Sequence, residues 1–196
     1  MPKLLVLAST SRYRRMLLER LGCPFEVASP GIDEAPLPSE PPAATASRLA
    51  EAKARAVVGR YQDALVIGSD QVAELDGRAV GKPVDHADAI AQLRAASGRT
   101  VVFHTGVALV DAASGRCRSR LVDVASTFRV LTDDDIARYL AREQPYDCAG
   151  SVKSEGFGIA LFERIASDDP TALIGLPLIA VASMLRDEGY DVLARA

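Results

Sequence analysis

ALVIGSD, residues 64–70, is an apolar run that ends in a polar pair, and it sets the centre of the predicted fold. An apolar run of this length with β-branched residues is typical of a buried strand. In open α/β sheets, ligands bind beyond the carboxyl ends of the strands. We therefore expect Ser69, Asp70 and Gln71 to lie at the carboxyl end of a central strand, at the edge of a site. The alternative is that Asp70 caps the turn that follows.

The patterns before this strand predict two further strands and two helices. Residues 3–8 are apolar, and the helix expected over 14–21 follows three hydroxyl residues and ends at a glycine. A short strand is expected over 25–28, and apolar residues at helical spacing predict a helix over 45–60. The proline-rich stretch between these two elements predicts a surface loop, which is a common place for ligand contacts.

The patterns after it predict alternating strands and helices. The Asp76-Gly77 pair predicts a hairpin turn, and the remaining periodicity predicts helices over 86–96, from 132 onward and over 178–188, with strands over 100–110 and up to 130. Strand pairs interleaved with helices indicate an α/β fold, a mixed sheet covered on both faces. Without a repeat or a linker, we expect residues 1–196 to form one domain.

Composition and charge restrict the classes of function. The 26 acidic and 23 basic residues give a net charge of −3, which offers no electrostatic case for binding a nucleic acid polymer or an anionic membrane. The apolar start is too short for a signal-peptide core or a membrane span. Three widely spaced cysteines suggest neither a disulfide framework nor a zinc site. These features favour a cytoplasmic protein.

LASTSRYRR, residues 7–15, has the features of an anion site. Ser9 and its neighbours precede a helix start, and Arg14 and Arg15 stand beside it. Helix N-termini attract anions, and arginine binds phosphate oxygens through two hydrogen bonds, so the stretch suits a di- or triphosphate. The same pattern also suits a capped surface helix with solvated arginines. No P-loop pattern occurs in the chain.

Other candidate groups are single charges. Asp70 is ionised at neutral pH if its pKa is unperturbed, so it could hold a divalent cation or accept a proton from water. Lys53 and Lys82 could neutralise a phosphate, although isolated lysines are usually solvated. The glycine-rich run over 148–159 contains Glu155, and it could form a hydrogen-bonding pocket for a base.

Six segments resemble, in this order, the motifs of the Maf family of nucleotide pyrophosphatases: LASTSRYRRMLLERLG (7–22), GIDE (31–34), IGSDQV (67–72), GKP (81–83), CAGSVKSEGFGIALFERI (148–165) and IGLPL (174–178). The resemblance covers nearly the whole chain. It implies an elongated mixed β-sheet flanked by helices, as in the inosine triphosphate pyrophosphatases. It also implies a cytoplasmic enzyme that hydrolyses a small-molecule nucleoside triphosphate with a divalent metal, Mg²⁺ or Mn²⁺. A homodimer is compatible with the same resemblance.

Within that family, SDQV and KSEGFG look like the subgroup that hydrolyses 7-methyl-GTP. The resemblance makes Asp70 the proton acceptor or a metal ligand, with Glu34 as a second metal candidate. It places substrate specificity at Tyr13, Gln71 and Glu155, and triphosphate binding at Ser9, Arg14, Arg15, Lys53 and Lys82. The chain departs from the subgroup in having Arg12-Tyr13 where Pro-Trp is usual, and Val152 where Phe is usual.

The subgroup assignment has a physical rationale. Methylation at N7 makes guanine a delocalised cation, so the Glu155 carboxylate would favour it over GTP. The Tyr13 ring could stack on the base with a cation–π energy of about 0.5–2 kcal/mol. Two alternatives stay open: the same reaction on dTTP, UTP or inosine triphosphate, and a nucleotide-binding regulator of cell division that does not turn its ligand over.

Overall fold

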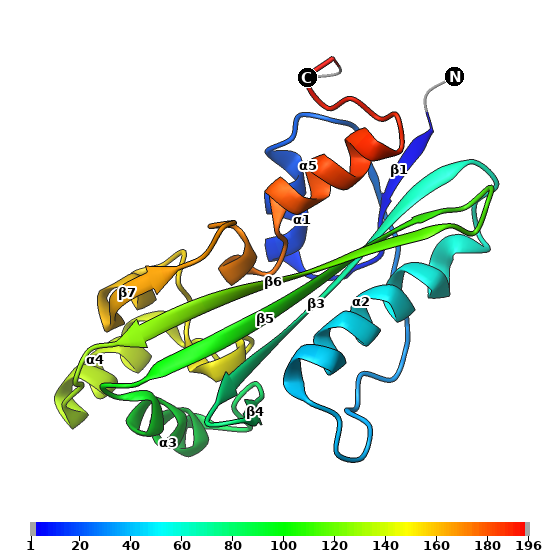
Figure 1. The fold of residues 1–196 in the computed structure, drawn as a ribbon. Helices are drawn as coiled ribbons and strands as arrows, with labels where there is room; N and C mark the ends of the chain where they lie inside the picture. Colours follow the sequence, from blue (N-terminus) through cyan, green and yellow to red (C-terminus); the bar gives the residue numbers. More distant parts are fainter. Residues whose placement is uncertain (1–2, 195–196) are drawn as a thin grey trace.

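The fold is built on a seven-stranded mixed sheet, seen in a computed structural model that describes residues 3–194 (Figure 1). The strand order is β2-β1-β3-β5-β6-β7, and β4 pairs with β3. β1 runs parallel to β2 and β3, whereas the other pairs are antiparallel. The strands are β1 (Leu4–Leu7), β2 (Glu26–Val27), β3 (Ala64–Leu75), β4 (Arg78–Val80), β5 (Thr100–Asp111), β6 (Cys117–Phe128) and β7 (Phe162–Ala166).

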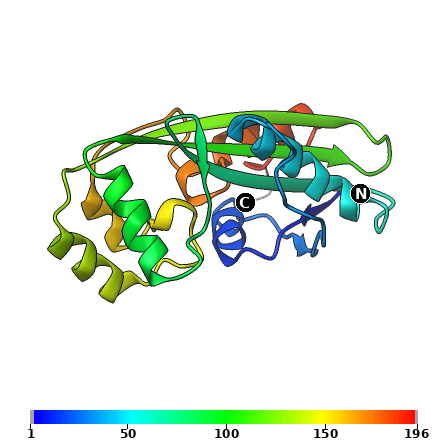
Figure 2. The same cartoon turned by 90° about the horizontal axis from the view of Figure 1, so that it is seen from below.

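Three strands of 12 residues each, β3, β5 and β6, run the length of the molecule and give it an elongated shape (Figure 2). The predicted mixed sheet is therefore confirmed. The prediction that a strand ends at Asp70 is wrong, because β3 continues to Leu75 and pairs with β5 from Leu65 to Glu74. On its other side, β3 pairs with β1 over Ala64–Ile67 and with β4 over Ala73–Leu75. Within residues 3–194, no strand covers the intervening Gly68–Val72 on this edge.

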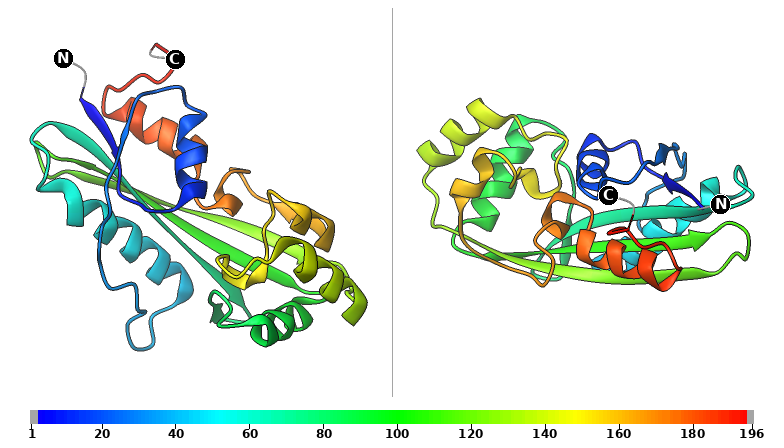
Figure 3. Two further views of the ribbon diagram at one scale, coloured as in Figure 1. Left: turned by 180° about the vertical axis from the view of Figure 1, so that it is seen from behind. Right: turned by 90° about the horizontal axis from the view of Figure 1, so that it is seen from above.

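Within residues 3–194, five α-helices cover the two faces of the sheet: α1 (Arg12–Glu19), α2 (Pro42–Val58), α3 (His86–Ala96), α4 (Asp133–Glu143) and α5 (Leu178–Asp187). α2 packs on one face, in a core with Val66 and Val110. The opposite face carries α1 and α5 near one end of the strands and α3 and α4 near the other (Figure 3). The prediction that helices cover both faces of the sheet is therefore confirmed.

Two glycines let α2 lie directly on the sheet. A Cβ atom at Gly68 would be 2.2 Å from the carbonyl oxygen of Ala50, and one at Gly106 would be 2.4 Å from that of Ala46. Real Cβ atoms do not approach backbone atoms this closely, so only glycine fits at either position. The helix is therefore pressed against β3 and β5 beside the uncovered part of the β3 edge.

Several predicted boundaries shift for local reasons. α1 begins at Arg12 rather than residue 14, because Ser11 is its N-cap and accepts a hydrogen bond from the Arg14 amide. α2 begins at Pro42, where proline suits the first turn. Val130 lies beyond the end of β6 and is 84% exposed, and β7 was not predicted. Between residues 3 and 194, no helix combines the length and apolarity needed to cross a bilayer.

Candidate active site

A cavity of about 950 Å³ opens at the uncovered part of the β3 edge. Its walls come from the start of α1, the loop before α2, α2 itself, β3 and the β4 end. A smaller cavity of about 130 Å³ adjoins it. The two share seven lining residues: Ser11, Tyr13, Arg14, Gln71, Lys82, Asp147 and Ala149. The cavities therefore form one cleft with a main chamber and a side pocket.

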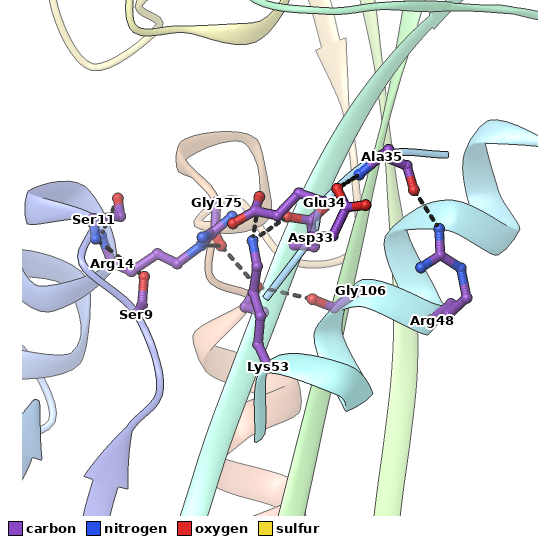
Figure 4. A network of polar contacts seen from close by, with 12 residues as sticks. Ser9, Ser11, Arg14, Asp33, Glu34, Ala35, Arg48, Lys53, Gly106 and Gly175 are labelled. Atoms are coloured by element: carbon purple, nitrogen blue, oxygen red, sulfur yellow. Dashed lines mark hydrogen bonds and ion pairs between the residues drawn. The ribbon is translucent and has the colours of Figure 1, made fainter. Parts of the chain in front are cut away.

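Lys53 joins two carboxylates on the wall of the main chamber. Its Nζ atom lies 2.7 Å from Oδ1 of Asp70 and 2.7 Å from Oε2 of Glu34. The side chains of Lys53 and Asp70 are nearly buried, whereas that of Glu34 is 55% exposed. Figure 4 shows the Lys53 side chain reaching up to Glu34 from α2. A nearly buried carboxyl group in direct contact with an ammonium group, on the wall of a cleft, is a candidate for the reactive site.

The position of Lys53 follows from the pattern of α2. The buried residues of this helix include Leu49, Ala50, Ala54 and Val57, and Lys53 lies on the same stripe. A lysine on an apolar helical stripe must find a buried anion. Because α2 lies against β3, Asp70 is that anion.

Arg14 and Ser69 form a second polar group at the other side of β3. The Nε atom of Arg14 donates to the Gly175 carbonyl at 2.9 Å, and the Ser69 hydroxyl contacts the carbonyls of Gly175 and Gly106 at 2.9 and 2.8 Å. Burial lowers the pKa of Arg14, while Asp70 and Glu34 act to raise it. Within residues 3–194, Nε is the only guanidinium nitrogen of Arg14 that donates a hydrogen bond. Its two terminal nitrogens are therefore available to a ligand.

Ser9 lies beside this group, at the end of β1. It is nearly buried, and its hydroxyl accepts a hydrogen bond from the Ser11 amide at 3.1 Å. Figure 4 shows Ser9, Ser11 and Arg14 together at the start of α1. Lys82 lines both cavities, and it makes no ion pair in the part of the chain that the structure describes. These placements bring Ser9, Arg14, Lys53 and Lys82 to one cleft.

Arg15 is placed differently from the other predicted phosphate ligands. Its Nε atom donates to Glu19 on the same helix at 3.0 Å, and its side chain is 64% exposed. It lines a separate shallow cavity with Cys23 and Phe25 rather than the cleft. The structure thus does not bring Arg15 to Asp70.

Gln71 is fixed by the backbone of the loop before α5. Its Nε2 group donates to the carbonyls of Ala172 and Leu173 at 2.8 and 3.1 Å and to the Thr105 hydroxyl at 3.0 Å. Because both backbone partners are carbonyl oxygens, which only accept hydrogen bonds, the amide atom that faces them must be the nitrogen. The amide oxygen of Gln71 therefore points away from these carbonyls. That oxygen accepts no hydrogen bond within residues 3–194, which leaves an acceptor for a ligand N–H group.

Tyr13 and Glu155 meet Gln71 in the side pocket. The Tyr13 hydroxyl donates to Asp147 at 3.2 Å and accepts from Arg12 at 2.6 Å, and the Arg12 guanidinium lies 4.7 Å from the centre of the Tyr13 ring. Burial raises the pKa of Tyr13, so its hydroxyl stays protonated and able to donate. Glu155 is exposed and makes no ion pair with any of residues 3–194. The three predicted specificity residues therefore share one pocket.

Sequence reasoning missed two groups of residues at this site. Asp147 contacts Tyr13 and lines both cavities, but nothing in its local sequence sets it apart from other loop aspartates. Glu40 and Arg48 form a bidentate pair at the loop that carries Glu34. In the sequence, the only signal for this pair is that an acidic residue precedes, and a basic residue follows, the start of the helix predicted over 45–60.

Two carboxylates of the cleft, Asp70 and Glu34, are candidate ligands for a divalent cation. Within residues 3–194, no group of three or more His, Cys, Asp and Glu side chains is arranged to hold a metal. Asp70 and Glu34 nevertheless both contact Nζ of Lys53, and each uses only one carboxylate oxygen for this contact. Their other oxygens have no protein partner in this part of the chain. Magnesium is commonly held by one or two carboxylates together with substrate phosphates, and these residues fit that pattern.

Comparisons with known proteins agree with this geometry. The model of the Maf-like protein family matches residues 4–188. A protein named 7-methyl-GTP pyrophosphatase from Aromatoleum aromaticum is 59% identical, over 94% of this chain and 95% of its own. A protein of the same name from Ralstonia nicotianae is 57% identical, over 97% of this chain and 98% of its own. The chain therefore belongs to the Maf family.

Proposed function

We propose that this protein is a nucleoside triphosphate pyrophosphatase that hydrolyses 7-methyl-GTP to 7-methyl-GMP and diphosphate. The observation that carries the proposal is the buried Lys53–Asp70 ion pair on the wall of a cleft with three further candidate phosphate ligands, Ser9, Arg14 and Lys82. Relatives that are 57–59% identical bear the name of this activity. Removal of a modified nucleotide from the triphosphate pool is a house-cleaning role.

The side pocket supports the choice of base. N7-methylated guanine carries a delocalised positive charge, and Glu155, which makes no ion pair within residues 3–194, offers its carboxylate in this pocket. The free carbonyl oxygen of Gln71 can accept from an N–H group of the base. A tenfold preference for the methylated base needs only about 1.4 kcal/mol of differential binding.

The reaction is an in-line attack of water on the α-phosphorus, with diphosphate as the leaving group. Asp70 accepts the proton of the attacking water or orients it. Lys53 holds Asp70 in place, and it also neutralises charge on the phosphates. Arg14 and Lys82 bind the leaving diphosphate, on which negative charge develops in the transition state. A divalent cation held by Asp70 and Glu34 would supply charge neutralisation and a lower pKa for the attacking water.

A panel of triphosphates tests this proposal. The purified protein is incubated with 7-methyl-GTP, GTP, dTTP, UTP and inosine triphosphate, with Mg²⁺, Mn²⁺ or EDTA, and diphosphate and monophosphate are quantified. We expect the highest kcat/KM with 7-methyl-GTP and a loss of turnover with EDTA. Faster hydrolysis of a pyrimidine or inosine nucleotide would reassign the substrate. Binding without turnover of any triphosphate would indicate a nucleotide-binding regulator instead.

Asp70→Asn tests the role of the carboxylate. The variant keeps the shape of the side chain, and Lys53 keeps its bond to Glu34, so we expect a folded protein with almost no turnover. Asp168→Asn is the matched control, because Asp168 is exposed and lies outside the cleft. Turnover by Asp70→Asn within tenfold of the wild type would remove Asp70 from the mechanism.

A further inference from the structure

We infer that Arg48 and Glu40 are positioning residues that hold the loop of residues 33–40 as a wall of the main chamber and keep Glu34 at Lys53. The inference rests on the proposed function, in which Glu34 is a candidate ligand of the divalent cation. Neither residue contacts Asp70 or Lys53 in the structure. Their effect on the reaction would therefore pass through the loop.

The pair has the geometry of a strong, directional contact. Nε of Arg48 lies 2.6 Å from one carboxylate oxygen of Glu40, and Nη2 lies 2.7 Å from the other. Two parallel hydrogen bonds between a guanidinium and a carboxylate fix both planes. The Glu40 side chain is only 10% exposed and that of Arg48 is 31% exposed. This contact raises the pKa of Arg48 and lowers that of Glu40 to about 2, so both are charged at neutral pH.

The same two side chains contact the backbone of the loop at two points, Ala35 and Leu37, and Glu40 is also bonded to Thr45 of α2. Glu40 accepts hydrogen bonds from the Leu37 amide at 3.0 Å and the Thr45 hydroxyl at 2.9 Å. Arg48 donates to the carbonyl of Ala35 at 3.1 Å. Ala35 is the residue after Glu34, and Figure 4 shows Arg48 of α2 beneath this part of the loop.

The loop needs side-chain hydrogen bonds because its proline-rich sequence prevents the backbone hydrogen bonds of a helix or strand. Pro36, Pro38 and Pro41 have no amide hydrogen, and the segment forms neither helix nor strand. Pro36, Leu37, Ser39 and Glu40 line the main chamber together with Glu34. The carboxylate of Glu34 is half exposed and has Lys53 as its protein partner. Its position in the cleft thus depends on the backbone that Arg48 and Glu40 hold.

Arg48→Lys and Glu40→Gln test the inference. Both keep the size and polarity of the side chain but remove the bidentate contact. We expect faster amide hydrogen exchange in peptides covering residues 33–40, with exchange in α5 unchanged. We also expect Mn²⁺ binding in the presence of a non-hydrolysable triphosphate, followed by the signal of the free ion in electron paramagnetic resonance, to weaken by about tenfold, the change that about 1.4 kcal/mol produces.

Two controls separate positioning from a general structural effect. Arg55→Lys changes another arginine of α2, which pairs with Glu51 on the exposed side of the helix, and it should alter neither measurement. In a Glu34→Gln background, Arg48→Lys should still speed loop exchange but should weaken Mn²⁺ binding little further. Such non-additivity is the signature of two residues that act through one contact.

Two results would overturn the inference. One is wild-type hydrogen exchange at residues 33–40 in both variants. The other is full additivity of Arg48→Lys and Glu34→Gln in Mn²⁺ binding. A wild-type protein that hydrolyses no triphosphate would refute the proposed function, and the exchange comparison would still decide whether the pair holds the loop.

Discussion

Nζ of Lys53 and Oδ1 of Asp70 lie 2.7 Å apart, and the two side chains are only 4% and 9% exposed. The lysine belongs to the face of α2 that packs on the sheet. The aspartate belongs to the part of β3 that no other strand of the described residues 3–194 covers on one edge. A buried ion pair contributes little net stability, but the loss of one partner leaves a buried charge uncompensated. The pair is therefore expected to matter for both stability and activity.

Lys53→Met is expected to destabilise the protein more than Asp70→Asn. Methionine keeps the length of the side chain but leaves the Asp70 carboxylate without its cation, at a cost of about 3–5 kcal/mol. Asp70→Asn leaves Lys53 bonded to Glu34, so its cost should be smaller. Urea unfolding at pH 7 measures both. The double variant Lys53→Met/Asp70→Asn should be more stable than Lys53→Met alone, and the opposite order would contradict this account.

Local signals in the sequence predicted much of the fold. The helix over His86–Ala96 has the predicted bounds. The Asp76-Gly77 turn joins β3 to β4, and both residues have a positive φ, as such a turn requires. In these segments, the turn and capping preferences of a few neighbouring residues decide the structure.

Other features depend on distant parts of the chain and could not be predicted. β3 continues through its polar residues because β5 pairs with it as far as Glu74. β7 exists because it pairs with β6, and its own sequence, FERIA, has no strong alternation. The candidate site is similar: Lys53 and Asp70 could be named from the sequence, but their contact depends on how closely α2 approaches the sheet.

Gly68→Ala is expected to disturb that approach. The added Cβ would lie 2.2 Å from the Ala50 carbonyl oxygen and 2.6 Å from the Ala54 amide nitrogen, so α2 must move. We expect a loss of about 1–3 kcal/mol or more in unfolding free energy, as for other overpacked sites. Because Lys53 lies between these two helix residues, kcat should fall as well.

Gly59→Ala is the matched control for this prediction. Gly59 ends the same helix with φ −66°, and a Cβ there would meet no atom within 4 Å. Its stability and kcat should stay close to the wild-type values. Wild-type stability of Gly68→Ala would show that α2 can move away from the sheet at little cost.

The stability contribution of Glu40 is expected to depend on pH. Contact with Arg48 lowers the pKa of Glu40 from 4.5 to about 2 in the folded protein. A carboxyl group with a depressed folded pKa stabilises the protein above its unfolded pKa, and this contribution is lost as pH falls through the folded pKa. The difference in unfolding free energy between wild type and Glu40→Gln should thus be constant from pH 5 to 8 and shrink from pH 4.5 towards 2.

Urea unfolding at a series of pH values measures this difference. Glu163→Gln, which changes an exposed glutamate of β7, serves as the control for the substitution itself. A difference between wild type and Glu40→Gln that does not shrink below pH 4.5 would show that the Arg48 contact does not depress the pKa of Glu40.

Arg12 is expected to weaken the preference for a methylated base. Its guanidinium lies over the Tyr13 ring, 4.7 Å from the ring centre. A protein cation therefore competes with the cationic base for the ring on which the base is proposed to stack. Arg12→Ala should therefore lower KM for 7-methyl-GTP by about threefold, the lower end of a cation–π contribution, and should change KM for GTP less.

The larger ring of tryptophan extends this test. Tyr13→Trp offers more stacking area and should also lower KM for 7-methyl-GTP, and the effect should be greater in the Arg12→Pro background, where no guanidinium competes for the ring. Proline is compatible with this position because Arg12 is the first residue of α1.

Arg20→Ala removes an exposed arginine at the end of the same helix and is the control for overall charge. Equal changes in KM for GTP and 7-methyl-GTP in Arg12→Ala would mean that Arg12 acts on the phosphates, because only the base differs in charge between these two substrates.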